Sequence, residues 1–174
     1  MASFENCIAW VLRFEDRLLS GVVKDLHDGV GLTRFGIAQT DHPGLPDDFY
    51  TGPLDAALAT AEGIYRREYW VPTHAGELRT DELAATLLSF AVNDGAHRAV
   101  ELLQGVLGLA ADGVVGPATL MAIHSISDES ATAARLREAQ AAFYGQIVSH
   151  HPEKGVFLTG WLRRALAVYP ALLS

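Results

Sequence analysis

The chain has 174 residues, of which 49% are hydrophobic, so it can bury the core of one compact domain. Its formal net charge is -8, and without a basic stripe to neutralise phosphates it is not expected to bind nucleic acid. No stretch of the sequence approaches the ~20 apolar residues of a membrane span, so stable insertion into a membrane is not expected either.

The first predicted element is an amphipathic helix that ends at Glu15. Phe4, Ile8 and Leu12 recur at helical spacing, and three residues beyond Leu12 the same apolar face carries Glu15. A carboxyl group that packs against apolar groups has a raised pKa and can stay protonated near neutral pH, as a general acid requires. Glu15 is therefore a candidate catalytic acid, and the alternative is a solvated residue at the end of a helix.

The segment from Leu18 to Gln39 is polar and rich in glycine and aspartate, which predicts loops and a short hairpin rather than a helix. Gly31 and Gly36 are expected to supply unusual backbone angles there. A partly buried glutamate followed by an Asp/Gly/Thr loop resembles the arrangement in lysozyme-type glycosidases.

Helical patterns fill the rest of the chain, and local start and stop signals bound them. The expected helices run from Pro53 to before Pro72, from Thr80 to Gly95, around Val100 to Gly108, from Pro117 to Ile126, from Asp128 to His150, and from near Gly160 to Val168. The stretch from His42 to Asp48 is a turn-rich connector. The sequence therefore predicts a mainly α fold with a small loop or hairpin region after the first helix.

Several motifs follow one another along most of the chain. They are Phe14-Glu15; Asp28-Gly-Val-Gly31-Leu-Thr33-Arg-Phe-Gly36-Ile37; Ile64-Tyr65-Arg-Arg-Glu-Tyr69-Trp70; Phe90-Ala-Val-Asn93-Asp-Gly95; Leu102-Leu-Gln104; Asp112-Gly-Val-Val-Gly116-Pro117-Ala-Thr119; and Phe157-Leu-Thr-Gly160-Trp161-Leu-Arg-Arg164. In this order they resemble the glycoside hydrolase 108 family, the N-acetylmuramidases of phage endolysins and secretion-associated lysozymes, with their peptidoglycan-binding tail. The resemblance implies a lysozyme-like fold, with a catalytic region over 1–95 and a helical peptidoglycan-binding-like region over 96–174 in the same globular unit.

One departure from the family pattern falls next to Glu15. The family carries Gly-Gly after its catalytic glutamate, whereas this chain has Asp16 and Arg17. The spacing from Glu15 to Asp28 is also longer than in the family. We therefore expect a remodelled loop, and two alternatives stay open: a catalytically inactive peptidoglycan-binding protein on the same scaffold, and a hydrolase of a related β-1,4 amino-sugar polymer such as chitin.

The catalytic roles follow from the chemistry of glycoside cleavage and from the resemblance. An acid must protonate the departing oxygen while positive charge grows on the sugar ring, and by position Glu15 is that acid. Asp28 is the first candidate for the second group, with Thr33 placing a water, and Asp25 is the fallback. Asp28 could equally brace a turn. We expect direct attack by water rather than a covalent intermediate, a choice that the carboxyl separation decides.

Three residues are candidates for sugar binding: Tyr65, Trp70 and Asn93. Tyr65 and Tyr69 lie on a helical stripe that also fits a core role, and Trp70 at the helix end is the better stacking surface. Asn93 offers both a donor and an acceptor to an acetamido sugar, although helix termination also explains it. Arg164 in the closing motif is expected to pack the last helix against the body.

No cofactor or metal is expected. The histidines show no ligand spacing, and neither an HExxH motif nor a Cys/His cluster occurs. Cys7 is the single cysteine, so it cannot form an internal disulfide and is expected to fill the core. Glycine-rich phosphate loops and a Gly-x-Ser-x-Gly elbow are also missing from the sequence, which excludes nucleotide chemistry and the usual serine hydrolases.

The resemblance implies an N-acetylmuramidase that cuts the β-1,4 bond between N-acetylmuramic acid and N-acetylglucosamine. Its partner would be the glycan strand of peptidoglycan, and we expect a monomer. The N-terminus lacks the pattern of a secretory signal peptide. We therefore expect synthesis in the cytoplasm and release to the cell wall through a holin or a secretion system.

Overall fold

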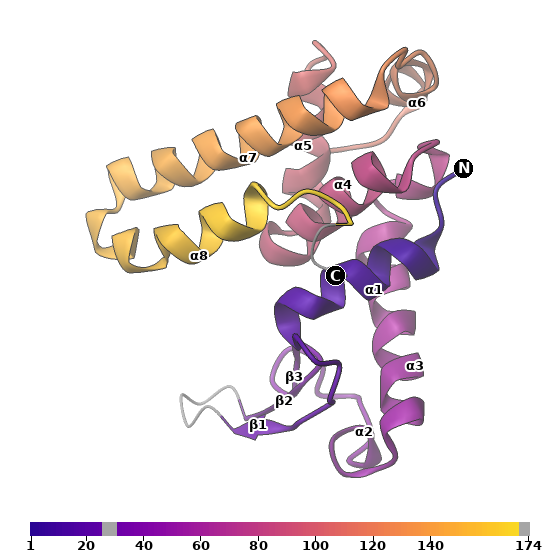
Figure 1. Ribbon diagram of the computed structural model, residues 1–174, viewed down its shortest axis with the longest axis vertical. Coiled ribbons are helices and arrows are strands. Elements are labelled where there is room, and N and C mark those ends of the chain that lie inside the picture. The colour runs from indigo at the N-terminus through magenta and orange to yellow at the C-terminus, as the bar shows by residue number, and fades with distance from the viewer. Residues whose placement is uncertain (26–30, 171–174) are drawn as a thin grey trace.

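The computed structural model describes residues 1–25 and 31–170, and 26–30 and 171–174 lie outside the described residues. Helices dominate, and the prediction of a mainly α fold is confirmed (Figure 1). The α-helices are α1 (Phe4–Glu15), α2 (Asp48–Thr51), α3 (Leu54–Tyr65), α4 (Asp81–Asp94), α5 (Ala96–Val106), α6 (Pro117–His124), α7 (Glu129–His150) and α8 (Gly155–Ala165). Short 3-10 turns cover Ala75–Glu77 and Pro152–Lys154. No described helix is long and apolar enough to cross a membrane.

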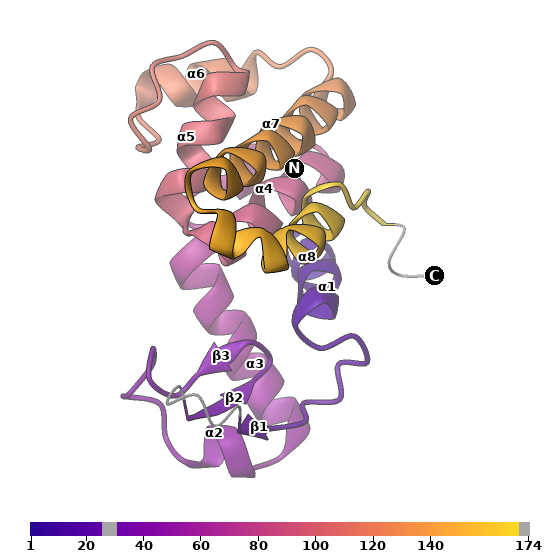
Figure 2. The same ribbon diagram turned by 90° about the vertical axis from the view of Figure 1, so that its left-hand side faces the viewer.

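The core is organised around α4. Every residue from Leu83 to Ala91 is buried, and a helix that is apolar all round must be covered on all sides. Helices α1, α5 and α7 supply this cover (Figures 1 and 2). The predicted ends of α4 are confirmed: the Thr80 hydroxyl accepts from the amide of Leu83, and Gly95 ends the helix with a φ of 90°.

A small antiparallel sheet lies beyond the end of α1 and contains β1 (Lys24–Asp25), β2 (Leu32–Arg34) and β3 (Ile37–Ala38). Strands β2 and β3 are joined by a two-residue turn in which Phe35 and Gly36 have φ values of 51° and 77°. Two successive positive φ angles define the tight hairpin turn that matches the twist of the strands. The unusual angles predicted for Gly31 and Gly36 are confirmed, since φ at Gly31 is 74°.

Helix α3 ends differently from the prediction. The α-helical part stops at Tyr65, and the chain continues as a π-helical turn over Arg66–Trp70, where the Val71 amide donates to the Arg66 carbonyl at 2.9 Å. An apolar period alone does not reveal such a wider turn. π-turns occur frequently at functional sites, and this one carries Tyr69 to within 5.7 Å of Tyr65, measured between ring centroids.

In the C-terminal half, α7 and α8 run side by side, and α8 reaches back to the end of α1 (Figures 1 and 2). Helix α8 begins at Gly155, earlier than the predicted start near Gly160, and it ends at Ala165. The early turn was missed because Val156 and Phe157 are exposed and add nothing to a buried stripe. Helix α2 was also missed, because it is only four residues long and follows a turn-rich connector.

Candidate active site

A cavity of about 430 Å³ opens where the end of α1, the β2–β3 turn, the π-helical turn, the end of α4 and the end of α8 meet. Its walls combine carboxylates, two basic side chains, an amide and two tyrosines. The lining residues are Glu15, Gly36, Ile37, Asp41, His42, Tyr65, Glu68, Tyr69, Val92, Asn93 and Arg164. The cavity therefore brings together three of the residues predicted from the sequence: Glu15, Tyr65 and Asn93.

Glu15 is the last residue of α1 and faces the cavity. Its side chain is 22% exposed, and its Oε1 atom accepts a hydrogen bond from Nη1 of Arg164 at 2.6 Å. The preceding turns of α1 are held in the core by Trp10, Val11 and Leu12. The carboxyl group is thus fixed by a well-anchored helix and reachable from the cavity.

The β2–β3 turn packs directly on Glu15 through Gly36. A Cβ atom at position 36 would lie 2.9 Å from both Cγ and Oε2 of Glu15 and 2.8 Å from the hydroxyl of Tyr65. That hydroxyl donates to the carbonyl of Phe35 at 2.8 Å, and this hydrogen bond anchors the turn to the end of α3. Burial and the charge of Glu15 raise the pKa of Tyr65, so the phenol stays protonated and keeps donating.

Arg164 closes the cavity from the side of α8. Its Nε donates to the hydroxyl of Ser89 on α4 at 3.1 Å, and its guanidinium lies over the ring of Phe14 with 5.1 Å to the centroid. The side chain is only 14% exposed, and Nη2 is buried without a hydrogen-bond partner among the described residues. The predicted packing of the last helix is present, but the contact with Glu15 was not foreseen.

His42 and Glu68 also line the cavity. His42 Nε2 lies 3.1 Å from Oε2 of Glu68, whose Oε1 accepts from Arg67 at 2.7 Å. Burial alone would raise the pKa of Glu68, but the hydrogen bonds from Arg67 and His42 outweigh it and lower that pKa. Glu68 is therefore ionised at neutral pH. The one faint signal for Glu68 in the sequence is its place inside the motif from Tyr65 to Trp70.

Tyr69 lies among the carboxylates of the cavity. Burial is the largest cause of the raised pKa of its phenol, and the charges of Glu68, Asp41 and Glu15 raise that pKa further. Three carboxylates therefore act on one hydroxyl group. A negative potential of this kind favours a substrate on which positive charge develops.

Asn93 reaches the cavity from the end of α4. Its Nδ2 donates to the hydroxyl of Tyr144 at 2.7 Å and to Oδ2 of Asp94 at 3.0 Å, while Tyr144 donates to the same carboxylate oxygen. The ring of Tyr144 stacks on Trp161 with centroids 5.2 Å apart. Asn93 is therefore oriented by α7 as well as by α4, and its Oδ1 atom carries no hydrogen bond in these interactions.

The other predicted site residues that the structure describes do not line this cavity. Asp28 lies outside the described residues. Thr33 is half-buried on β2, and its hydroxyl is buried with no hydrogen-bond partner in the described part of the chain. Asp25 is exposed on β1. Trp70 is buried in the core, with its ring 5.4 Å from that of Phe4, so its indole does not line the cavity.

Comparison with known proteins identifies the family of the chain. The glycosyl hydrolase 108 family model matches residues 8–95, and the model of a predicted peptidoglycan domain matches residues 98–166. The chain belongs to the glycosyl hydrolase 108 family. It is therefore a glycoside hydrolase that acts on peptidoglycan. The first match covers α1 to α4, and the second includes Arg164, so residues from both matched regions line the cavity.

One solved structure supports the assignment over the full length. Brucella abortus SagA is 26% identical in sequence and superimposes with a TM-score of 0.63, covering 96% of this chain and 95% of that one. No curated protein matches the sequence. The similarity to SagA spans both matched regions, so their arrangement in one unit is shared with a solved structure.

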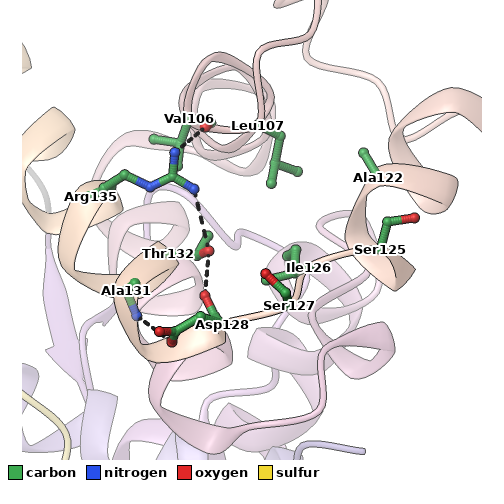
Figure 3. Close-up of a pocket in the computed structure, with 10 residues that line it drawn as sticks. All are labelled: Val106, Leu107, Ala122, Ser125, Ile126, Ser127, Asp128, Ala131, Thr132 and Arg135. Atoms are coloured by element: carbon green, nitrogen blue, oxygen red, sulfur yellow. Dashed lines mark hydrogen bonds between the residues drawn. The ribbon is translucent and has the colours of Figure 1, made fainter.

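A second cavity of about 490 Å³ lies within the region matched by the peptidoglycan domain, between α5, α6 and α7 (Figure 3). Its two charged residues serve the fold. Arg135 donates to the carbonyl of Val106 at 3.2 Å, and Asp128 accepts from the amide of Ala131 at 2.9 Å as the N-cap of α7. Leu107, Ala122 and Ile126 contribute apolar surface. The charged side chains of this second cavity are thus engaged by contacts within the fold.

In the described part of the chain, the side chains that could bind a metal are not clustered. No group of three or more histidine, cysteine, aspartate or glutamate side chains there is placed to hold a metal ion. Cys7 is buried in α1 and its thiol donates to the carbonyl of Asp81, with 3.6 Å between the two atoms. The groups available for catalysis are carboxylates, an imidazole, phenols and a guanidinium.

Proposed function

We propose that the protein is an N-acetylmuramidase, which hydrolyses the β-1,4 bond between N-acetylmuramic acid and N-acetylglucosamine with Glu15 as general acid. One observation carries the proposal: the family glutamate at the end of α1 lies on the wall of a cavity, one-fifth exposed and beside apolar Phe14 and Ile37. A general acid needs this combination of access to the leaving oxygen and partial removal from water.

In the proposed reaction, Glu15 passes its proton to the glycosidic oxygen while the bond from that oxygen to the anomeric carbon breaks. Positive charge then develops on the sugar ring. The ionised Glu68, which lines the same cavity, stabilises this charge, and Asp41 lies on the cavity wall as well. A water molecule adds to the anomeric carbon and passes a proton to the second catalytic carboxylate, and Glu15 takes up a new proton from solvent.

The second catalytic group remains the proposed Asp28, which follows β1 in the chain. Thr33 is the proposed water-placing residue. Its support is the buried hydroxyl without a partner, because an unpaired buried hydroxyl is costly and is normally satisfied by water or ligand. Direct attack by water is the proposed course, with inversion at the anomeric carbon.

Substrate recognition is assigned to Asn93 and the tyrosine pair. The Oδ1 atom of Asn93 is available to accept the N–H of an acetamido group, since the Nδ2 atom is engaged by Tyr144 and Asp94. Tyr69 supplies the partly exposed ring of this pair, and the buried ring of Tyr65 packs next to it with 5.7 Å between the ring centroids. Aromatic faces of this kind pack against the apolar face of a sugar ring.

The proposed place of action is the cell wall, reached through a holin or a secretion system. The protein is proposed to act as a monomer. The glycan strand must enter an open cleft of a single molecule, which requires no second copy.

The test is digestion of purified peptidoglycan followed by mass analysis of the released muropeptides. Wild type is expected to release fragments with N-acetylmuramic acid at the reducing end, and Glu15→Gln is expected to release none. Glu138→Gln is the matched control, because Glu138 is exposed on α7 and does not line the cavity. Fragments with reducing N-acetylglucosamine, cleavage of chitin oligomers alone, or equal activity of Glu15→Gln would refute the proposal.

A further inference from the structure

The contact between Glu15 and Arg164 joins residues that are 149 positions apart in the sequence. It is the point where the region matched by the peptidoglycan domain enters the cavity of the hydrolase region. Nothing in a wall-binding role calls for a buried guanidinium beside the acid. The contact therefore indicates that Arg164 has a role in the reaction.

The guanidinium is held in place from three sides. Ser89 on α4 accepts from Nε, Phe14 on α1 lies under its plane, and α8 carries its backbone. Packing of α8 alone does not require the hydrogen bond that Nη1 of Arg164 donates to the carboxylate of Glu15 at 2.6 Å. Bonds from two of its nitrogens to two elements fix its orientation, and through Nη1 they fix the rotamer of Glu15.

We propose that Arg164 is a positioning residue for the glycosidase reaction, which orients the carboxyl of Glu15 and stabilises the negative charge that Glu15 acquires when it gives up its proton. This inference rests on the proposed function of Glu15. It makes the active site composite, with the acid from the hydrolase region and its orienting cation from the closing helix of the peptidoglycan region.

Arg164 stabilises the ionised carboxylate of Glu15 more strongly than the protonated carboxyl group. In the protonated form that acts as the acid, the carboxyl group is neutral, and its hydrogen bond with a guanidinium is of ordinary strength. As the proton moves to the leaving oxygen, charge appears on the carboxylate, and the same contact becomes a charge-assisted hydrogen bond in a site largely shielded from water. An interaction that strengthens toward the transition state raises turnover rather than binding.

The expected result is a loss in turnover without a loss in binding. Arg164→Gln should lower the maximal rate of peptidoglycan digestion by about 10- to 100-fold, the scale at which a misplaced catalytic group acts. Co-sedimentation with insoluble peptidoglycan should stay within twofold of wild type. Arg164→Lys should recover part of the rate, because a single ammonium keeps the charge but not the bonds to both Glu15 and Ser89.

Chemical rescue separates this role from simple helix packing. Arg164→Ala leaves a space lined by Phe14, Ser89 and Glu15. Millimolar guanidinium should raise the digestion rate of this variant at least fivefold. Arg163→Gln is the matched control, since Arg163 is the preceding residue, carries the same charge and is exposed. Its rate and its guanidinium response should equal those of wild type.

Three results would overturn the inference while leaving the muramidase proposal intact. They are an Arg164→Gln rate within twofold of wild type, an Arg164→Gln rate above wild type, and a loss that guanidinium does not restore in a variant whose melting temperature matches wild type. Failure of the muramidase proposal has a different signature, namely a wild-type digest without reducing N-acetylmuramic acid. If Arg164→Ala does not fold, the same outcomes are read from Arg164→Lys and Ser89→Ala, which keep the charge and loosen its orientation.

Discussion

Gly36 approaches Glu15 so closely that no side chain fits between them. A methyl group at position 36 would lie 2.9 Å from Oε2 of Glu15 and 2.8 Å from the Tyr65 hydroxyl, and the φ of 77° disfavours any residue with a Cβ atom. We predict that Gly36→Ala displaces the carboxyl of Glu15 and lowers the rate of peptidoglycan digestion by at least tenfold. Peptidoglycan digestion assays measure this loss of rate, and circular dichroism checks that the variant is folded.

Gly63→Ala is the control for that change. Gly63 lies in α3 at an ordinary helical position, and an added Cβ meets nothing within 4 Å. The substitution should leave the rate unchanged and raise the free energy of unfolding by about 0.5–1 kcal/mol, because alanine loses less backbone entropy in a helix. Normal activity in Gly36→Ala would show that the turn yields without moving the acid.

The hydroxyl of Tyr65 is predicted to hold the turn in place. Tyr65→Phe removes the 2.8 Å bond to the Phe35 carbonyl and leaves that buried oxygen without a donor, so the free energy of unfolding should fall by about 1–3 kcal/mol. Tyr50→Phe is the matched control, because the Tyr50 hydroxyl is buried with no hydrogen-bond partner in the described residues. Denaturant titration should find this control neutral or more stable, and equal losses in both variants would contradict the assignment.

The helices could be predicted because their determinants are local. Thr80 and Gly95 bound α4, and Asp128 caps α7 by accepting from the Ala131 amide at 2.9 Å. These interactions span three or four residues, so the donor and the acceptor lie close together in the sequence and can be recognised from it. The position of Glu15 on an apolar face could be found for the same reason, since helical spacing sets it.

The remainder of the site could not be predicted because it depends on tertiary contacts. Arg164 meets Glu15 across 149 positions, and His42 meets Glu68 across 26. No periodicity links such pairs. Trp70 illustrates the converse: its place at a helix end suggested an exposed stacking surface, but the π-helical turn directs its indole toward Phe4 and the core.

Asp16 explains how the chain accommodates its departure from the Gly-Gly of the family. Its carboxylate accepts from the Gly21 amide at 2.6 Å, from the Ser20 hydroxyl at 3.1 Å and from the Leu18 amide at 3.3 Å, so it anchors the longer loop. Burial works to raise the pKa of Asp16, but these hydrogen bonds outweigh it and hold the pKa below its usual range.

A pH dependence of stability follows from Asp16, and its sign is fixed by the lowered pKa. The ionised carboxylate stabilises the fold above the unfolded pKa of about 3.9, and this contribution is lost as pH falls toward the folded pKa. Asp16→Ala should therefore lower the melting temperature at pH 7, with a difference from wild type that shrinks below about pH 4. Thermal melts from pH 3 to pH 7 measure it, and a difference that grows on acidification would contradict the role.

Gln104 is predicted to hold the Asp112–Thr119 loop together. It is only 1% exposed, its Nε2 donates to Asp112, Val114 and Thr119, and its Oε1 accepts from the Gly113 amide at 2.9 Å. Gln104→Leu keeps the volume but strips four partners at once, so the free energy of unfolding should fall by at least about 2 kcal/mol.

Limited proteolysis would locate that loss. The loop between α5 and α6 should become the first site of cleavage in Gln104→Leu, because its carbonyl and amide groups are then held by water instead of by the glutamine. Gln146→Leu on the exposed face of α7 is the control and should stay within about 0.5 kcal/mol of wild type. The Glu15 cavity has no lining residue in this loop, so Gln104→Leu should still cleave glycan below its melting temperature, and a loss of cleavage in the folded variant would show that the loop supports the active site as well.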